Sequence, residues 1–443
     1  MQNKFQKNIG LSLIILLALI PIIIWLTILP IQDRFSSLET FLQSFGQIAG
    51  LIGMVLFALN LILSNRLKIL DKIFGGLNNV YIKHRFIGGL TFILLVFHPI
   101  LLACRFLIAS VHDAKLFIVG SVMYPPTLWG ILALSLMLVL IVLTFYVRIR
   151  YHIWRFSHKF MGVVFILGFI HVVRITSDVS ESATLRYYVV IISILGIISW
   201  IYNTVLNKFL VRKISYSVDS IIKVSPFISE LKLIPNGRKL AYEAGQFAFI
   251  SLAKKSENLS KEDHPFTMIS KPNENSLSFA IKNLGDYTSH LGEIKTGNKI
   301  LVQGAYGKFS YKNAPSKKQI WIAGGIGITP FVAMARDLSQ NSDEGFEINL
   351  FYSVVTEEEA VFAEELKKIS EDDKRFMLHL SISKKDGYLS ADKIIASLKL
   401  SSTEIANYDI FICGPLEMMK IITEQFIKIG LNKGRIHSEN FSL

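Results

Sequence analysis

The sequence predicts a multidomain protein in which six transmembrane helices precede a small antiparallel β-barrel and a doubly wound α/β domain. Three observations lead to this fold class. Of the 443 residues, 51% are hydrophobic, and the long apolar runs lie in the first half of the chain. From about residue 214 the pattern changes to short alternating stretches, which are typical of antiparallel strands. After about residue 318, apolar strands alternate with amphipathic helices, as in a parallel sheet.

Six apolar segments are long enough to cross a bilayer, which takes about 20 helical residues. They run at about 9–31, 44–64, 84–108, 127–147, 158–176 and 186–207. The first segment follows Lys4 and Lys7, as a secretory signal would. Because it is long and lacks a small-residue cleavage pattern, we expect a retained transmembrane helix.

The loops between these segments differ in charge. If the N-terminus is cytoplasmic, the inner loops hold most of the loop cations, including Lys83, Arg155 and Lys208. The positive-inside rule therefore predicts a multi-pass cell-membrane protein with both termini in the cytoplasm. The formal charge of +13 fits this topology and contact with anionic lipid. No basic arm interleaved with aromatics predicts a nucleic-acid partner, and no obligatory protein partner is evident.

Four histidines lie within the apolar segments. His84 and His98 are fourteen residues apart in the third segment, and His158 and His171 are thirteen apart in the fifth. At about 1.5 Å per residue, each pair spans roughly 20 Å along the membrane normal. Imidazole is costly to bury in lipid, so such histidines are functional candidates. Two ligands at two depths on each helix predict two stacked haems, and bis-imidazole ligation suits electron transfer.

The two pairs differ in their helical geometry. Fourteen residues bring His98 back to the face of His84, whereas thirteen residues rotate His171 by about 220° from His158. Either the fifth helix is irregular, with Gly162 and Gly168 as candidate soft points, or the two haems differ in azimuth. Each histidine alone could instead bond a neighbouring backbone group or line a polar cavity. The loop histidines His112 and His152 are expected at the surface.

Two motifs stand in the predicted barrel, residues 211–315. The first has a fixed proline, an aromatic ring and hydroxyls that could lie along a flavin ring, although an ordinary strand start is the alternative. The second, from Lys282 to Thr288, opens a predicted helix, where backbone donors suit a pyrophosphate, and a capped helix after a turn is the alternative. The candidate flavin contacts are His264, Pro265, Phe266, Thr267, Ser270, Lys282, Asp286 and Thr288.

The predicted nucleotide domain, residues 316–443, contains a glycine-rich turn between a strand and a helix. The glycines allow close approach of a diphosphate, while a threonine can cap the helix and a proline fits its first position. These residues are Gly324, Gly325, Gly327, Thr329 and Pro330. Cys413, Gly414 and Pro415 end a later strand at the edge where such sheets bind ligands. Gly304 and Gly307 form a turn that could face the nicotinamide.

Together these elements resemble the NADPH oxidase and ferric reductase family of transmembrane flavocytochromes, as a minimal single-chain member of bacterial type. The resemblance covers nearly the whole chain and rests on motifs in the family's order. They are the histidine spacings, His-Pro-Phe-Thr from His264, Gly-Gly-Ile-Gly-Ile-Thr-Pro from Gly324, Cys-Gly-Pro from Cys413 and a terminal Glu-Asn-Phe ending at Phe441.

The resemblance implies a haem-binding transmembrane bundle followed by a ferredoxin-reductase-like module. By it, His84 with His158 would hold the inner of two b-type haems, and His98 with His171 the outer. Residues 264–267 would contact FAD, and the glycine-rich turn the dinucleotide. Cys413 and Phe441 are the expected catalytic positions, and Phe441 would stack on the flavin and give way to the nicotinamide.

The resemblance also implies an activity. Electrons from cytosolic NADPH or NADH would pass through FAD and the haems to an extracytoplasmic acceptor, with superoxide formed if that acceptor is O₂. The alternative acceptor is chelated Fe(III) or Cu(II), and a transporter or sensor whose histidines relay protons is the rival of another class. Ser353 is followed by Glu357, Glu358 and Glu359 and by no basic residue suited to a 2′-phosphate. With no long tether after residue 207, we expect the flavin domain to dock under the inner haem.

Overall fold

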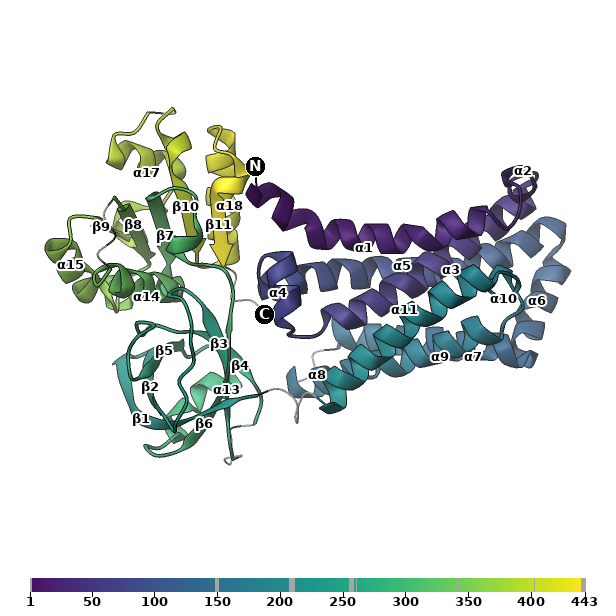
Figure 1. Ribbon diagram of the computed structural model, residues 1–443, viewed down its shortest axis with the longest axis horizontal. Helices are drawn as coiled ribbons and strands as arrows, with labels where there is room; N and C mark the ends of the chain where they lie inside the picture. The colour runs from purple at the N-terminus through teal and green to yellow at the C-terminus, as the bar shows by residue number, and fades with distance from the viewer. Residues whose placement is uncertain are drawn as a thin grey trace. The chain divides into compact units, whose positions relative to one another are not determined.

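A computed structural model describes residues 2–147, 151–206, 212–254, 259, 261–341, 343, 345–401 and 403–439. The chain divides into two compact units, Met1–Leu210 and Val211–Leu443. The first is helical, and the second contains two β-sheets (Figure 1). Phe441, the expected flavin-stacking residue, lies outside the described residues.

The first unit is a bundle of long apolar helices. Its elements are α1 (Gln2–Leu26), α2 (Ile31–Arg34), α3 (Leu38–Leu63), α4 (Lys68–Phe74), α5 (Leu77–Ala109), α6 (Val111–Met123), α7 (Pro125–Phe145), α8 (Tyr151–His158), α9 (Met161–Arg174), α10 (Asp178–Glu181), α11 (Ala183–Ile201) and the π-helical turn η1 (Tyr202–Leu206). Within the described ranges, six helical stretches are long and apolar enough to cross a membrane. They are Ile9–Leu26, Leu38–Leu63, Leu77–Ile108, Pro125–Phe145, Ile153–Arg174 and Ala183–Leu206. The prediction of six spans is confirmed.

The helix boundaries differ from the predicted ones where polar residues form turns. The first span ends at Leu26, five residues earlier than expected, and α3 begins at Leu38, six residues earlier. Ser37 caps α3, since its hydroxyl accepts the Thr40 N–H at 3.2 Å while Thr40 Oγ1 accepts the Ser37 N–H at 3.0 Å. Counting apolar residues misses such interfacial turns because capping satisfies the backbone there without hydrophobic side chains.

The loop predicted after the third span contains a helix instead. This helix, α6, carries His112 near its start and exposes Leu116, Val119 and Met123. Exposed apolar side chains on a spanning protein are suited to contact with lipid. The side chain of His112 is exposed, as expected. The side chain of His152 lies outside the described residues.

The fifth span is interrupted between two haem-ligand candidates. Helix α8 ends at His158 and α9 begins at Met161, so the chain turns at Lys159 and Phe160. The Lys159 carbonyl accepts the Gly162 N–H at 3.3 Å and also the indole N–H of Trp200 at 2.8 Å. Of the two alternatives for the thirteen-residue spacing, the structure has the irregular helix. The interruption precedes Gly162, and Gly168 lies inside α9.

The second unit begins with an antiparallel six-stranded sheet that curls into an open barrel. Its strands are β1 (Ile214–Ser225), β2 (Ile228–Pro235), β3 (Phe247–Leu252), β4 (His264–Thr267), β5 (Leu277–Lys282) and β6 (Lys299–Tyr306), in the order β4-β3-β6-β1-β2-β5. An isolated bridge between Met268 and Phe279 links the two edges. Short helices α13 (Asp286–Ser289) and η2 (Leu291–Glu293) follow β5. The predicted barrel is confirmed.

The remainder of this unit is a parallel five-stranded sheet with helices on both faces. The strands are β7 (Lys318–Gly324), β8 (Glu347–Val354), β9 (Phe376–Ile382), β10 (Asp409–Cys413) and β11 (Ile436–Glu439), in the order β11-β10-β7-β8-β9. The helices are η4 (Gly325–Ile328), α14 (Thr329–Leu338), η5 (Glu357–Glu359), α15 (Ala363–Asp372), α16 (Ser383–Asp386), α17 (Ala391–Leu398) and α18 (Leu416–Lys428). Buried Trp321 packs with α14 on one face, and its neighbour Ile320 packs with α18 on the other. Such alternation is the doubly wound pattern that the sequence predicts.

The barrel and the parallel sheet share one hydrophobic core. Ile269 and Phe309, which lie outside the parallel sheet, pack in the same cluster as Trp321 and Phe331. Arg336 of α14 strengthens this junction, because its guanidinium donates to the Ile269 carbonyl at 2.8 Å. The same group pairs with both carboxylate oxygens of Glu365, at 2.6 and 2.7 Å. Paired, bidentate guanidinium contacts of this kind fix geometry as well as charge.

Candidate functional site

The four membrane histidines form two facing pairs. His84 of α5 faces His158 at the end of α8, with ring centroids 6.3 Å apart. His98, fourteen residues or about four helical turns further along α5, faces His171 of α9, with ring centroids 6.5 Å apart. The structure thus brings together the predicted partners at two levels of the bundle. On a regular helix, His158 and His171 would point to opposite sides. The break at Lys159 allows both of them to face α5.

Main-chain carbonyls hold three of the four rings. His84 Nδ1 lies 3.1 Å from the Asn60 carbonyl, His98 Nδ1 lies 2.8 Å from the Gly46 carbonyl, and His171 Nδ1 lies 2.8 Å from the Pro126 carbonyl. Because a carbonyl oxygen can only accept, Nδ1 carries the proton in these rings and Nε2 keeps its lone pair. Second-sphere bonds of this type orient metal-binding histidines.

The fourth histidine is held by stacking. The His158 ring stacks on the indole of Trp154, one helical turn earlier, with centroids 5.4 Å apart. Its buried Nδ1 has no hydrogen-bond partner among the described residues. His158 is therefore oriented by stacking on an aromatic ring, whereas His171 is oriented by a main-chain carbonyl.

The pair separations fit a haem iron between the rings. A metal–imidazole bond is about 2.0 Å and the ring centre lies about 1.1 Å from its nitrogen, so two imidazoles on opposite sides of one metal place their centres about 6.2 Å apart. The separations of 6.3 and 6.5 Å match this sum. No group of three or more His, Cys, Asp or Glu side chains is gathered as a metal site in the described ranges. A haem needs only two protein ligands, because the macrocycle supplies the other four.

Glycines next to the rings were not singled out by the sequence patterns. A Cβ on Gly50 of α3 would lie 2.8 Å from His98 Nδ1, and one on Gly130 of α7 would lie 3.0 Å from His171 Nδ1. Glycine at these positions gives the imidazoles room beside the helix backbones. The sequence spacing of the histidines could not reveal Gly50 and Gly130, because these glycines lie on helices other than those of the rings that they contact.

The residue between the two levels is also polar. Thr91 lies seven residues from both His84 and His98 on α5, is 3% exposed, and its hydroxyl has no hydrogen-bond partner in the described part of the chain. At 3.6 residues per turn, seven residues return nearly to the same face. Thr91 therefore shares the face of His84 and His98.

The predicted flavin motif forms edge strand β4. Residues His264, Pro265, Phe266 and Thr267 pair with β3, and the His264 ring stacks on Tyr287 with centroids 3.7 Å apart. Burial raises the pKa of the Tyr287 hydroxyl to about 12, so it stays protonated at neutral pH. This stacking joins the two predicted flavin motifs, since Tyr287 lies in α13.

Other predicted flavin residues have structural partners. The buried Ser270 hydroxyl accepts the Ser278 N–H at 3.0 Å and lies 2.9 Å from the Tyr242 hydroxyl. Thr288 Oγ1 accepts the Leu284 and Gly285 N–H groups at 2.9 and 3.0 Å, which is the capping role weighed as its alternative. Lys282 ends β5, and the side chain of Asp286 lies outside the described residues.

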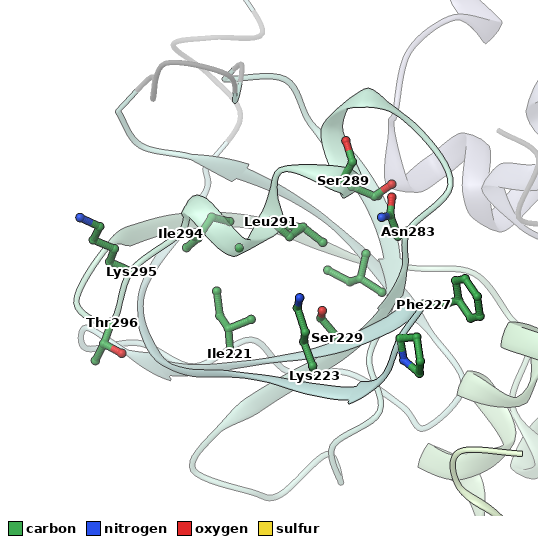
Figure 2. Close-up of a pocket in the computed structure, with 14 residues that line it drawn as sticks. Ile221, Lys223, Phe227, Ser229, Asn283, Ser289, Leu291, Ile294, Lys295 and Thr296 are labelled. Carbon is green, nitrogen blue, oxygen red and sulfur yellow. The ribbon is translucent and has the colours of Figure 1, made fainter. Parts of the chain in front are cut away.

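A cavity lies at the mouth of the barrel beside α13 (Figure 2). Its volume is about 540 Å³, and Thr288 contributes to its wall. Lys223 and Lys295 lie on its rim, and no carboxylate side chain lines it among the described residues. Thr288 therefore caps α13 and also lines a cavity whose charged lining residues are lysines.

The glycine-rich turn packs directly on the Cys-Gly-Pro turn. A Cβ on Gly327 would lie 2.3 Å from the Cys413 carbonyl oxygen, and one on Gly324 would lie 2.7 Å from Met418 Cε. Gly325 has φ +53° and Gly414 has φ +159°, conformations that favour glycine. The structure thus brings the two predicted nucleotide motifs together at the carboxyl edge of β7 and β10.

The helix after this turn starts differently from the prediction. Pro330 occupies the first turn of α14 as expected. Thr329, however, is itself helical, and its hydroxyl donates to the Ile326 carbonyl at 3.1 Å instead of accepting a backbone N–H. The preceding η4 turn already satisfies this end, so no side-chain cap is needed.

Cys413 is enclosed at the end of β10. Burial and the nearby Glu439 raise the pKa of its thiol well above the ordinary value, so the group is neutral at pH 7. Glu439 is in register with Cys413 on β11, and a Cβ on Gly307 would lie 3.8 Å from a Glu439 carboxylate oxygen. Gly307, with φ +92°, therefore lies at this edge directly after β6, and Gly304 lies within β6.

Three domain families match the chain in order. The ferric reductase like transmembrane component matches residues 49–169, the FAD-binding domain matches residues 208–324, and the oxidoreductase NAD-binding domain matches residues 321–424. A transmembrane component joined to these two domains defines a membrane-bound flavoprotein oxidoreductase. The chain belongs to the NADPH oxidase and ferric reductase family.

Individual relatives resemble parts of the chain. NADH-cytochrome b5 reductase 2 of Mycosarcoma maydis is 28% identical over 36% of this chain and 48% of its own length. Dual oxidase 2 of Rattus norvegicus is 26% identical over 39% of this chain and 13% of its own length. The chain spans about half the length of the first curated relatives that it matches. Flavohemoglobin of Malassezia yamatoensis has a similar fold, with a TM-score of 0.50 at 17% identity over 90% of this chain and 96% of the other.

Proposed function

We propose that this chain is a transmembrane NAD(P)H oxidoreductase that uses FAD and two b-type haems to deliver electrons to an extracytoplasmic acceptor. The observation that carries the proposal is the pair of histidine separations, 6.3 and 6.5 Å, each matched to an iron bound by two imidazoles. The family match of the other half supports the flavin and the nicotinamide nucleotide.

The roles of the residues follow from their positions. His84 with His158 would bind one haem and His98 with His171 the other, each through Nε2. Bound flavin accepts a hydride and releases single electrons, and bound haem carries electrons one at a time. His98 and His171 would both be occupied in holding their haem, so we expect the acceptor to react at the outer end of the bundle and not to be bound by these histidines.

The flavin and nucleotide contacts are proposed by domain. Residues 264–267 and α13 would hold FAD in a domain of residues 211–315. The glycine-rich turn, with Gly414 packed beneath it, would hold the diphosphate of the nucleotide in a domain of residues 316–443. Neutral Cys413, Glu439 and the Gly307 turn converge at the sheet edge, where a nicotinamide could lie without a charged thiol beside it.

The orientation is proposed from charge. Lys83 of α5 and Arg155 of α8 belong to the cation-rich end of the bundle of residues 1–210, which would be cytoplasmic together with the nucleotide domain by the positive-inside rule, and Lys208 of the sequence follows the last apolar segment. Electrons would then enter on the cytoplasmic side and leave at the level of His98 and His171. Protease accessibility of the nucleotide domain in right-side-out and inverted vesicles tests this orientation.

Two acceptors are proposed, with O₂ as the first. An oxidase would produce superoxide, whereas the match to a ferric reductase like component favours Fe(III) or Cu(II) as the alternative. Dismutase-sensitive cytochrome c reduction, compared with ferric chelate reduction by the same preparation, separates them. Superoxide formation that exceeds metal reduction at equal acceptor concentration is the expected result.

The proposal is tested by an anaerobic absorption spectrum of the purified full chain before and after addition of NADH or NADPH. The expected spectrum has a low-spin Soret band that shifts on reduction, together with bleaching of the flavin absorbance. A protein without haem absorbance would contradict the proposal and favour a proton-relaying transporter or sensor.

A further inference from the structure

The carboxyl ends of β7 and β8 form one continuous edge. The two strands are parallel neighbours, and Gly324 at the start of the glycine-rich turn is in register with Ser353 of β8. In doubly wound sheets the diphosphate lies on the turn after the first strand, and the adenosine ribose reaches the end of the next strand. If the domain binds a nucleotide as proposed, the residues that follow β8 would therefore lie near its adenosine ribose.

Those residues are acidic. The η5 turn consists of Glu357, Glu358 and Glu359 and begins three residues after β8 ends at Val354. The first two side chains are exposed, and the backbone of this turn is held by the Tyr352 hydroxyl, which donates to the Glu359 carbonyl at 3.2 Å. Anchoring of this kind keeps the carboxylates at the end of β8.

Two lysines approach the same edge from β9. The Lys384 N–H donates to the Val355 carbonyl at 3.4 Å, so the α16 turn runs beside the end of β8. Lys385 Nζ lies 2.7 Å from Glu357 Oε1 and therefore already has an anionic partner. No lysine or arginine lies within ion-pair distance of Glu358 or Glu359 in the ranges that the structure describes.

The charges at this edge favour a hydroxyl over a phosphate. The three glutamates and Asp386 outnumber the two lysines by two charges. A phosphate monoester carries about −1.5 to −2 charges at pH 7, and it is bound in proteins by cationic donors. A ribose 2′-hydroxyl, in contrast, can donate a hydrogen bond to a carboxylate, and acidic residues at this position bind NAD.

We infer that the nucleotide site selects NADH over NADPH, and that Glu358 and Glu359 are the residues that exclude the 2′-phosphate. This inference rests on the proposed function and names the electron donor within it. Since the first two glutamates of the turn are exposed and exposed charges are screened by salt, we expect a preference of about tenfold to a hundredfold at low ionic strength. The preference should shrink as salt is added.

Two measurements on the purified full chain test the inference. The first compares kcat/KM for anaerobic flavin reduction by NADH and by NADPH. The second measures binding of ADP-ribose and of 2′-phospho-ADP-ribose by calorimetry, which requires no electron transfer. We expect NADH and ADP-ribose to be preferred by at least about tenfold.

The variants separate charge at this site from charge elsewhere. The double variant Glu358→Gln, Glu359→Gln should bring the two nucleotides to within about threefold, mainly by improving NADPH. Glu371→Gln is the matched control, since it removes one exposed carboxylate near the end of α15, a helix that runs away from the carboxyl edge. It should leave the preference unchanged.

The outcomes are distinct. Equal or better use of NADPH by the natural chain would overturn the inference and leave the proposed function standing. The inference would also be overturned if Lys384→Met weakened binding of 2′-phospho-ADP-ribose more than binding of ADP-ribose, because Lys384 would then bind the 2′-phosphate. If neither nucleotide reduces the flavin and neither ribose compound binds, the proposed function itself fails.

Discussion

At the scale of single residues, the arrangement around the histidines is set by backbone groups. The Gly46 and Pro126 carbonyls fix the rings of His98 and His171 through Nδ1, which leaves Nε2 of each ring directed away from its own helix support. Carbonyls cannot be lost by mutation of their own side chains. The ring orientation is therefore less sensitive to mutation of the neighbouring residues than it would be if a side chain accepted the hydrogen bond.

The double variant His98→Ala, His171→Ala should lose one of two haems. Without axial imidazoles, the outer level has no ligand for iron, whereas His84 and His158 are unchanged. We expect haem per protein, measured as the pyridine haemochrome, to fall by about half. His112→Ala removes an exposed histidine of α6 and serves as the control. Unchanged haem content in the double variant would refute the ligand assignment.

Gly50→Ala should disturb the outer site specifically. The new methyl group would lie 2.8 Å from His98 Nδ1, closer than carbon and nitrogen approach without a shift, so the ring must move from the Gly46 carbonyl. We expect a shifted midpoint potential and altered low-spin EPR signal for one haem. Gly89→Ala is the matched control, because nothing lies within 4 Å of its added Cβ. Identical spectra for both variants would count against the contact.

At the scale of elements, the break between α8 and α9 decides the site geometry. Thirteen residues on a regular helix would point His158 and His171 about 220° apart. The turn at Lys159 and Phe160 removes this conflict, and Trp200 of α11 closes the break from outside through its bond to the Lys159 carbonyl. Helix α11 thereby supports the segment that carries His158 and His171.

Gly162→Ala should weaken this support. A Cβ at Gly162 would lie 2.1 Å from the Trp200 ring, which must then move and lose its bond to Lys159. Overpacking and one lost hydrogen bond together cost about 2–4 kcal/mol. We expect a lower apparent Tm of the purified protein and loss of haem on heating. Gly168→Ala, in the same helix and with its nearest neighbour 3.9 Å away, should have little effect.

Periodicity predicts elements better than their ends. Six spans, an antiparallel barrel and a parallel sheet follow from apolar length and alternation, and all are found. Helix α6 was not predicted, because it does not change the apolar composition of its segment. An irregular fifth helix was one of two open alternatives, and the structure places the break at Lys159 and Phe160, before the candidate soft points Gly162 and Gly168. The cap role of Thr329 was wrong for a related reason: η4 precedes the helix, and no sequence pattern separates a 3-10 turn from a loop.

At the scale of the whole molecule, sequence motifs give a partial view of the site. The pairing of His84 with His158 was implied by resemblance, and the facing rings agree with it. The contact of Gly327 with the Cys413 carbonyl joins residues more than 80 positions apart, which spacing alone does not reveal. The residue roles and domain boundaries proposed for FAD and nucleotide remain predictions for the experiments above.

The histidine pairs are separated along the membrane normal, so electron transfer between them would move charge across the membrane voltage. Fourteen residues on α5 separate His84 from His98 by about 21 Å, roughly two thirds of a hydrocarbon core of about 30 Å. A charge moved over this distance therefore senses about two thirds of the membrane voltage, or about 1.5 kcal/mol per 100 mV.

In proteoliposomes with the nucleotide domain inside, an inside-negative diffusion potential should speed outward electron delivery, and an inside-positive one should slow it by up to about tenfold per 100 mV. Potassium gradients with valinomycin set the voltage, and reduction of an external acceptor reports the rate. A rate independent of voltage would contradict charge movement between the two levels as the slow step. The spacing of two histidines would thus couple a cell's nicotinamide pool to its membrane potential.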